Sequence, residues 1–364
     1  MLDSLASFIS KKSAVEEHYF NINYIRFVDD AKPYKRGTVI FSDGKIIPPY
    51  PRIGRFFILE EGIKKFFKEP YYIEEKADGY NIRITHYEGT PLAITRGGFV
   101  CPFSTDRLQD FFPFKDFFSK FPDLILCGEI VGPDNPYMEL HPPYIQSDIT
   151  FKLFDVYNLS ENRFLLPEER YTLTGFINIE EVRCFGKYST EEINDVRDLI
   201  SKINEEGIEG VVFKSSEKKL RYFKYSTPEI NIKDIEADID LLLELPAEFF
   251  IQRLVRYALA ASELNCHNSK NANRIGTIFT DSFMKILEEF KSKGKISREY
   301  TLYFNIYENI DEFLELENRA SSLIKTRLIS VENCGSKFKV TIEKTFLKAT
   351  SKLSRLIRGL PLYD

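Results

Sequence analysis

The stretch EKADGYNIR, residues 75–83, decides the fold of this chain. It closes the apolar run YYIEEK, turns at a glycine and opens a second alternating run, which places Lys76 at a turn between two strands. A lysine is a nucleophile only when deprotonated, and its reference pKa is about 10.4. Because burial and neighbouring cations lower a lysine pKa, we expect further cations around Lys76. Taken alone, the pattern is also typical of a surface turn with a solvated lysine.

Short strand-like runs surround this stretch from residue 71 to about 228. They are YYIEEK, YNIRITHYEG, PLAITRG, LILCGEIVG, TFKLFDVYN, EGVVFKS and LRYFKYS. Turns rich in Gly and Pro join them, and helices are expected near 105–121 and 190–205. This order predicts an α+β domain built on antiparallel sheet.

The segments on either side have a different character. Before residue 70, a hairpin is expected around Ser42-Asp43-Gly44, and a helix is expected in FFILEEGIKKFFKE. After Pro228 the chain is acidic, which marks a boundary, and from about 235 it is expected to be mostly helical. Helices are predicted over 246–264, over SFMKILEEFKSK with a stop at Gly294, and over 299–328. The aromatic residues of these helices indicate either a core or a subunit interface.

Charge is distributed unevenly along the 364 residues, although the net charge is only −5. Residues 229–248 hold seven acids and one base, whereas residues 336–360 hold seven bases and one acid. A second basic run lies at 214–224. Local fields rather than net charge attract polyanions. The basic runs are therefore either solvated faces or contacts for a nucleic-acid backbone.

Composition excludes several classes of protein. Apolar residues make up 43% and charged residues 29%, as in globular chains, and no apolar run is long enough to cross a membrane. The first residues lack a signal-peptide pattern, so we expect a cytoplasmic protein without a membrane partner. The five cysteines form no C-x-x-C pair, and the four histidines are scattered. Neither a disulfide framework nor a zinc site is predicted.

Polar and aromatic residues recur in the strands that follow Lys76. They are Arg96 in ITRGG, Glu129 in LILCGEIVG, Phe151 in TFKLFDVYN, Glu209 and Lys214 in EGVVFK, and Lys224 in RYFKYS. Since each lies in a strand-like run, a pocket walled by sheet could bring them together. Phe154 is an alternative to Phe151, and Lys219 and Arg221 are alternatives to Lys224.

In these motifs and their order, residues 71–228 resemble the covalent nucleotidyltransferases, the superfamily of polynucleotide ligases and mRNA capping enzymes. They are most similar to the archaeal-type homodimeric ATP-dependent RNA ligases. The resemblance implies an α+β, ATP-grasp-like ligase fold with an antiparallel-sheet adenylyltransferase domain at 71–228. It also implies an N-terminal module at 1–70, a helical dimerisation domain at 235–315 and a C-terminal domain at 316–364.

The resemblance also implies a role for each site residue. Lys76 is expected to attack the α-phosphate of ATP and form a lysyl-N–AMP phosphoramidate. The other implied contacts are those of Glu75 with the adenine edge, Phe151 with the adenine ring, Glu129 with the ribose hydroxyls, Asn81 and Arg96 with ribose or phosphate, and Lys214 and Lys224 with the α-phosphate. Glu209, with Glu129, is expected to hold Mg²⁺ or Mn²⁺, because carboxylate and water ligands suit hard cations.

The implied activity joins RNA 5′-phosphate and 3′-hydroxyl ends, using ATP and a homodimeric protein. Asn81 occupies the position where DNA ligases of the superfamily usually carry arginine, and no C-terminal OB-fold signature is evident. Both features disfavour a DNA ligase and a GTP-dependent capping-type nucleotidyltransferase, which remain alternatives together with a non-catalytic nucleic-acid-binding relative. The residues that orient pyrophosphate stay open, and Arg52 and Arg55 are candidates for the β- and γ-phosphates.

Overall fold

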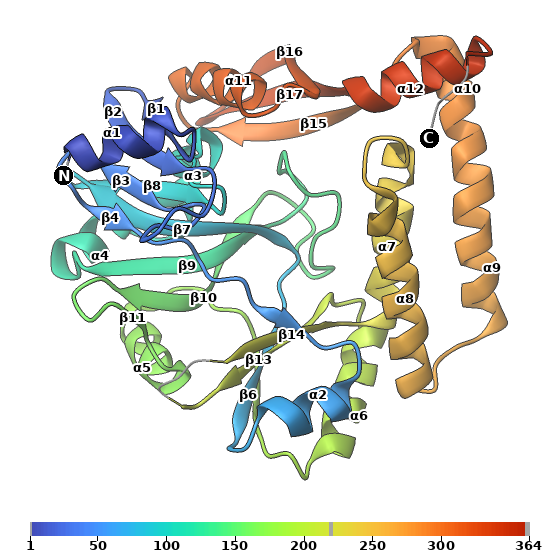
Figure 1. Cartoon of the computed structure of the whole chain (residues 1–364), viewed down its shortest axis with the longest axis horizontal. Helices are drawn as coiled ribbons and strands as arrows, with labels where there is room; N and C mark the ends of the chain where they lie inside the picture. The colour runs from blue at the N-terminus through green and yellow to red at the C-terminus, as the bar shows by residue number, and fades with distance from the viewer. Residues whose placement is uncertain (1, 218–220, 361–364) are drawn as a thin grey trace.

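Two five-stranded sheets form the centre of the molecule in the computed structural model, which describes residues 2–217 and 221–360 (Figure 1). The first has the order β11-β10-β9-β7-β8 and the second the order β12-β6-β13-β14-β5. The first sheet comprises β7 (Gly79–Tyr87), β8 (Thr90–Thr95), β9 (Leu124–Val131), β10 (Thr150–Asn158) and β11 (Arg163–Phe164). The second comprises β5 (Gly54–Arg55), β6 (Tyr71–Glu75), β12 (Cys184–Tyr188), β13 (Gly210–Ser215) and β14 (Tyr222–Ser226). The antiparallel α+β domain predicted around Lys76 is thus confirmed.

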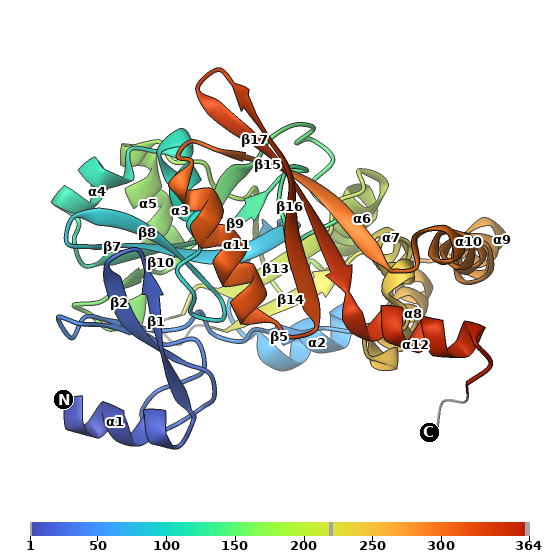
Figure 2. The same cartoon turned by 90° about the horizontal axis from the view of Figure 1, so that it is seen from above.

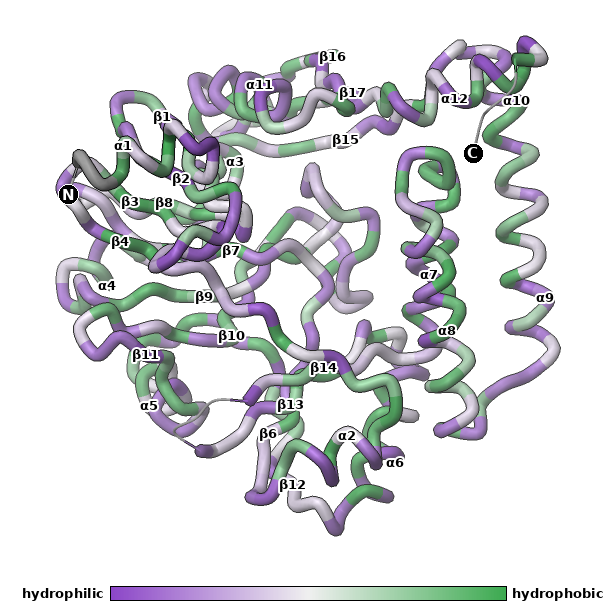
Figure 3. The backbone as a smooth tube through the Cα atoms, viewed as in Figure 1, coloured by the Kyte–Doolittle hydropathy of each residue, from purple (hydrophilic) through white to green (hydrophobic). Residues whose placement is uncertain are grey.

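Helices cover the outer faces of both sheets. They are α3 (Pro102–Phe111) and α4 (Phe114–Lys120) on the first sheet and α2 (Leu59–Phe66) and α6 (Ile193–Glu205) on the second, with α5 (Pro167–Ile177) between β11 and β12. The helices expected near 105–121 and 190–205 are therefore present. Hydrophobic residues concentrate along β9 and β10 (Figure 3). The opposite face of each sheet is not covered by these helices. On the first sheet, part of that face packs against the N-terminal segment and part lines the cavity described below.

The N-terminal segment forms a four-stranded sheet that packs against β8, β9 and β10. Its elements are α1 (Leu2–Ser10), β1 (Ala14–Tyr19), β2 (Ile22–Phe27), β3 (Val39–Phe41) and β4 (Ile46–Ile47). The β3–β4 pair is the hairpin predicted around Asp43. The segment then crosses to the second sheet, where β5 pairs in parallel with β14, and Phe56 stacks on Phe223 with ring centroids 4.5 Å apart.

Helices follow the acidic boundary, as predicted. They are α7 (Pro228–Asp238), a short 3₁₀ turn (Ile239–Leu241), α8 (Ala247–Glu263), α9 (Ser269–Thr277), a π-helical turn (Ile278–Ser282) and α10 (Phe283–Lys293). Gly294 ends α10 with a left-handed φ of 68°, a conformation that glycine adopts without strain. Helices α9 and α10 lie at the far end of the molecule from α1 in both views (Figures 1 and 2).

The helix predicted over 299–328 is present only in its middle part, as α11 (Glu308–Ala320), and the residues before and after it form strands instead. The chain forms β15 (Ser297–Phe304), α11, β16 (Ile324–Cys334), β17 (Lys337–Phe346) and α12 (Leu347–Ile357), and the three strands make an antiparallel sheet. In β15 the buried side chains recur every second residue, as in a strand: Leu302 and Phe304 are both fully buried. Phe304 packs on Phe103 of α3, with ring centroids 5.3 Å apart. Burial against the first sheet thus outweighs the helical spacing of the aromatic residues.

Candidate active site

Lys76 lies where the two central sheets face each other, directly after β6. Its backbone N–H donates to the carbonyl oxygen of Gly210 at 2.9 Å, which fixes it to β13. The turn that follows must end in a glycine, because a Cβ on Gly79 would collide with the carbonyl oxygen of Ile130 on β9. The K-x-D-G pattern therefore serves a close approach of β7 and β9 as well as placing the lysine.

A carboxylate holds the amine of Lys76. Its Nζ lies 2.5 Å from Oε2 of Glu209, which precedes β13. Burial lowers the pKa of Lys76, but the nearby carboxylates of Glu209, Glu129 and Asp78 outweigh this effect and raise the pKa above its usual value. The expectation that surrounding cations lower this pKa is wrong for the protein alone. Lys76 is held protonated, so any reaction at its nitrogen must first remove a proton.

A cavity beside Lys76 gathers most of the predicted site residues. Seven of them line it: Lys76, Glu75, Asn81, Arg96, Glu129, Lys214 and Lys224. Glu209 reaches the same place through its ion pair with Lys76. Phe154, the predicted alternative to Phe151, also lines it. Tyr50, Ile53, Glu74, Ala77 and Val212 complete the lining and were not predicted. The arrangement brings together residues from both sheets, as their positions in strands indicated.

One wall of the cavity carries two hydrogen-bond acceptors without partners. Asn81 on β7 and Glu129 on β9 are direct neighbours in the strand register. Asn81 Oδ1 and Glu129 Oε2 are both buried and have no hydrogen-bond partner. Burial raises the pKa of Glu129 to about 8, against the effect of Lys76. Because an unsatisfied buried acceptor is costly, this wall is built to meet hydroxyl groups or a cation.

The cavity is also lined by cations, among them Lys76, Arg96 and Lys224. Lys224 on β14 and Arg55 on β5 are paired in register, and Arg55 Nη1 donates to Ser226 Oγ at 2.6 Å. Burial, followed by the positive charges of Arg55 and Lys76, lowers the pKa of Lys224 to about 8. These like charges lie close together in partial burial. They form a site for a negatively charged group such as phosphate.

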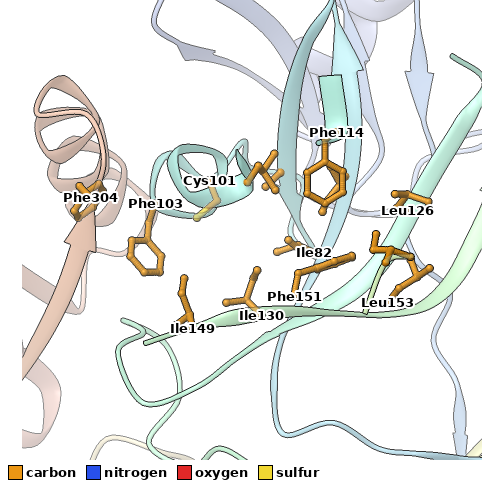
Figure 4. Packing of buried hydrophobic residues seen from close by; sticks show 14 of the residues in the cluster. Ile82, Cys101, Phe103, Phe114, Leu126, Ile130, Ile149, Phe151, Leu153 and Phe304 are labelled. Atoms are coloured by element: carbon orange, nitrogen blue, oxygen red, sulfur yellow. The ribbon is translucent and has the colours of Figure 1, made fainter. Parts of the chain in front are cut away.

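Phe151 does not reach the cavity, so its predicted contact with an adenine ring is wrong. The residue is 1% exposed and packs in the core with Phe114, their ring centroids 6.0 Å apart (Figure 4). Its ring occupies the space that a Cβ on Gly128 would need. Phe154 lines the cavity instead, next to a register shift between Leu153 and Asp155.

Lys214 also differs from its predicted role. It is 1% exposed, and its Nζ lies 2.9 Å from Asp155 Oδ1, 2.9 Å from Glu74 Oε2 and 2.6 Å from the carbonyl oxygen of Phe154. Arg170 pairs with the same Glu74 at 2.7 Å. With three acceptors around its amine, Lys214 neutralises buried carboxylates and is not free to bind an α-phosphate.

The carboxylate of Glu75 also has hydrogen-bond partners within the protein. It accepts hydrogen bonds from Tyr144 Oη at 2.6 Å and Arg183 Nε at 2.5 Å. Lys219, the alternative to Lys224, lies outside the described residues, and Arg221 donates to the carbonyl oxygen of Phe66, on the side of α2. Of the two candidates within the described residues, Lys224 is the one that lines the cavity.

Two sheets, antiparallel except for the β5–β14 pair, face each other around a half-buried lysine held by a carboxylate, which is the architecture of a nucleotidyltransferase-type ligase. Family models account for most of the chain: the model described as RNA ligase matches residues 69–226, and that of the Ligase Pab1020 C-terminal region matches residues 238–360. The chain belongs to the RNA ligase family and is a ligase enzyme.

Solved structures show the same architecture over the whole chain. A protein of Aquifex aeolicus, provisionally named an ATP-dependent DNA ligase, is 35% identical, with a TM-score of 0.93 and 100% of both chains covered. An archaeal ATP-dependent RNA ligase is 26% identical, with a TM-score of 0.89, covering 99% of this chain and 96% of its own.

A relative is also known from its sequence. This uncharacterized protein of Methanocaldococcus jannaschii is 28% identical over 361 residues, which are 96% of this chain and 91% of its own. Among the described residues, none of the helices has the length and apolar character needed to span a membrane.

Proposed function

We propose that the protein is an ATP-dependent RNA ligase that seals 5′-phosphate and 3′-hydroxyl ends through a lysyl-N–AMP intermediate. The observation that carries the proposal is the pairing of Lys76 Nζ with Glu209 at 2.5 Å, between the unpartnered acceptors of Asn81 and Glu129 and the cation Lys224. The acceptors suit ribose hydroxyls, and the cation suits the α-phosphate. These contacts fit any ribonucleoside triphosphate, and the similarity to an archaeal ATP-dependent RNA ligase favours ATP.

The first step forms a bond between Lys76 Nζ and the α-phosphorus while the bond from that phosphorus to the β-phosphate oxygen breaks. Pyrophosphate leaves with the bonding electron pair. The lysine must lose a proton, and Glu209 is the adjacent acceptor. Lys224 and Arg96 line the cavity on the phosphate side, where they neutralise charge on the α-phosphate oxygens.

In the second step, an oxygen of the RNA 5′-phosphate bonds to the same phosphorus and the P–N bond breaks. Lys76 regains its electron pair and a proton. In the third step, an RNA 3′-hydroxyl displaces AMP from the activated end and forms a 3′–5′ phosphodiester bond. No oxidant or reductant is needed, and each step is a displacement at phosphorus that depends on positioning and charge neutralisation.

The site also suits a divalent cation held partly by the nucleotide. In the described part of the chain, no group of three or more Asp, Glu, His or Cys side chains is placed to hold a metal ion. Mg²⁺ is commonly bound by one or two carboxylates together with phosphates and water. Glu129, with its unpartnered Oε2, and Glu209 would hold Mg²⁺ or Mn²⁺, which would supply positive charge to the phosphates.

The remaining segments have proposed roles in assembly. We propose that residues 71–228 carry the chemistry, that 1–70 form an N-terminal module, and that 235–315 and 316–364 are dimerisation and C-terminal domains. Helices α8 and α10 support a homodimer, since Ile251, Val255 and Met284 are apolar residues that stay 46–58% exposed. We propose that a second copy of this chain covers these exposed residues.

The proposal is tested by covalent labelling without nucleic acid. The wild-type chain, incubated with α-³²P-ATP and a divalent cation, is expected to carry label on a denaturing gel, whereas α-³²P-GTP gives none. A chase with 5′-phosphorylated RNA should remove the label, and a matched DNA strand should remove it at least about tenfold more slowly. Labelling by GTP would indicate a capping-type enzyme. Equal or faster transfer to DNA would instead match the name of the Aquifex relative.

A separate experiment tests whether Phe154 or Phe151 contacts the adenine ring. We expect Phe154→Ala to weaken ATP binding about tenfold, because stacking of a base on an aromatic ring contributes about 1–3 kcal/mol. Phe151→Ala should instead lower the free energy of unfolding by about 3–5 kcal/mol, because it empties a filled core position. Titration calorimetry and urea unfolding of both variants measure the two effects. Weaker ATP binding by a stably folded Phe151→Ala variant, with Phe154→Ala unchanged, would reverse the assignment.

A further inference from the structure

A second hollow, with a volume of about 530 Å³, adjoins the nucleotide cavity and shares Tyr50 and Arg96 with it. We call it the basic hollow, because Lys35, Arg36, Arg52 and Arg96 line it against one acid, Asp30. The first three cations belong to the N-terminal segment and Arg96 follows β8. The hollow therefore joins that segment to the rim of the site.

The positive charge of the basic hollow is largely unneutralised. Asp30 accepts from Lys35 Nζ at 3.2 Å and from the backbone N–H of Arg36 at 2.9 Å. Within residues 2–217 and 221–360, no carboxylate lies within 4.0 Å of the guanidinium groups of Arg36, Arg52 or Arg96. Three exposed arginines thus remain available for an anion. An arginine fork binds phosphate through paired N–H donors.

In contrast, most of the contacts seen for the basic runs at 214–224 and 336–360, which the sequence suggested for RNA binding, are with other protein groups. Lys337 pairs with Asp110 at 2.9 Å, Lys344 pairs with Glu317, and Lys348 donates to the carbonyl oxygen of Glu244 at 2.7 Å. Lys214 is buried among carboxylates, as described above. Arg36, Arg52 and Arg96 of the basic hollow, by contrast, carry unneutralised charge next to the nucleotide cavity.

We propose that the basic hollow binds the 5′-phosphate end of the single-stranded RNA that accepts AMP. This rests on the proposed function and names the place of one of its substrates. Arg96 borders both the hollow and the cavity of Lys76, so a phosphate held there lies beside the nucleotide. The volume is within the range of small-ligand sites, and Tyr50 with the prolines on either side of it gives an apolar wall against which a base can pack.

The test compares Arg36→Ala/Arg52→Ala with wild type in two assays. In the first, fluorescence anisotropy without ATP measures binding of a short oligoribonucleotide with either a 5′-phosphate or a 5′-hydroxyl. We expect wild type to prefer the phosphorylated strand. The variant should bind that strand about tenfold more weakly, and the slope of log affinity against log salt should fall by about 1.4, at about 0.7 for each lost phosphate contact.

The second assay measures the rate of labelling by α-³²P-ATP, which we expect to stay within about twofold of wild type. Lys285→Ala/Lys291→Ala is the matched control, since it removes two exposed positive charges from α10 and should change neither assay. Unchanged RNA binding by the arginine variant would overturn the proposal. Lost labelling with unchanged RNA binding would assign the hollow to the β- and γ-phosphates of ATP and would overturn it too. Because the binding assay needs no ATP, it tests the basic hollow even if the chain forms no lysyl-N–AMP.

Discussion

Lys76→Ala is expected to abolish covalent labelling by ATP, lowering its rate by at least about 10⁴-fold. In the proposed mechanism, Lys76 Nζ forms the bond to the α-phosphorus, and an alanine offers no substitute nucleophile. Joining of RNA ends should fall to the same extent when ATP is the source of AMP. The measurement is a time course of label on the denatured chain, with thermal unfolding recorded to show that the variant is folded.

The same variant should keep the last step of the reaction. Given RNA that already carries a 5′-adenylyl group, sealing requires attack by a 3′-hydroxyl and no lysine nucleophile, so we expect it to remain measurable. Lys68→Ala, which changes an exposed lysine shortly before β6, is the control and should label normally. Label that persists on the Lys76→Ala chain would place the nucleophile at another residue.

Lys214→Met is expected to lower the free energy of unfolding by about 3–5 kcal/mol. The change leaves Asp155 and Glu74 buried with one cation fewer, and an uncompensated buried charge is costly. Arg170 remains beside Glu74, 2.7 Å away, but its distance to Asp155 is 3.8 Å. Asp155 therefore loses its close cationic partner. Urea unfolding of the variant and of wild type measures the difference.

Two further variants separate the buried charge from a general effect of losing a lysine. Lys214→Met/Asp155→Asn also removes the negative charge of Asp155, which is left without a close cation in Lys214→Met. We therefore expect the double variant to recover part of the lost stability. Lys187→Met breaks an ion pair with Glu168 in which both side chains are more than 40% exposed, and it should change stability by no more than about 1 kcal/mol. A change below about 1 kcal/mol in Lys214→Met, with weakened ATP binding, would restore the phosphate role predicted from the sequence.

The sheets around Lys76 could be predicted because each strand combines alternating apolar residues with a clear turn. The same residues placed Lys76, Asn81, Glu129 and Lys224 at one cavity. The spacing alone could not choose between Phe151 and Phe154, because a register shift in β10 alters which residues face inward. Gly128, which makes room for the ring of Phe151, was the available signal.

The ion pairs of Lys214 with Glu74 and Asp155 could not be predicted without knowing which strands are neighbours. Glu74, Asp155 and Lys214 are charges inside apolar strands, a pattern that requires them to meet one another when buried. Their strands are far apart in the chain, so the pattern indicated burial without naming the partners. The raised pKa of Lys76 was missed for a related reason, since three carboxylates from separate strands and turns surround it.

The parallel pairing of β5 with β14 sets the minimum length of a working fragment. The match to the RNA ligase family begins at residue 69, but the last strand of the second sheet comes from residues 54–55. A chain cut at 69 would lose Arg55 and leave β14 as an open edge, and such edges pair with other molecules. Expression of the catalytic half by itself should therefore start before β5 if the product is to remain unaggregated.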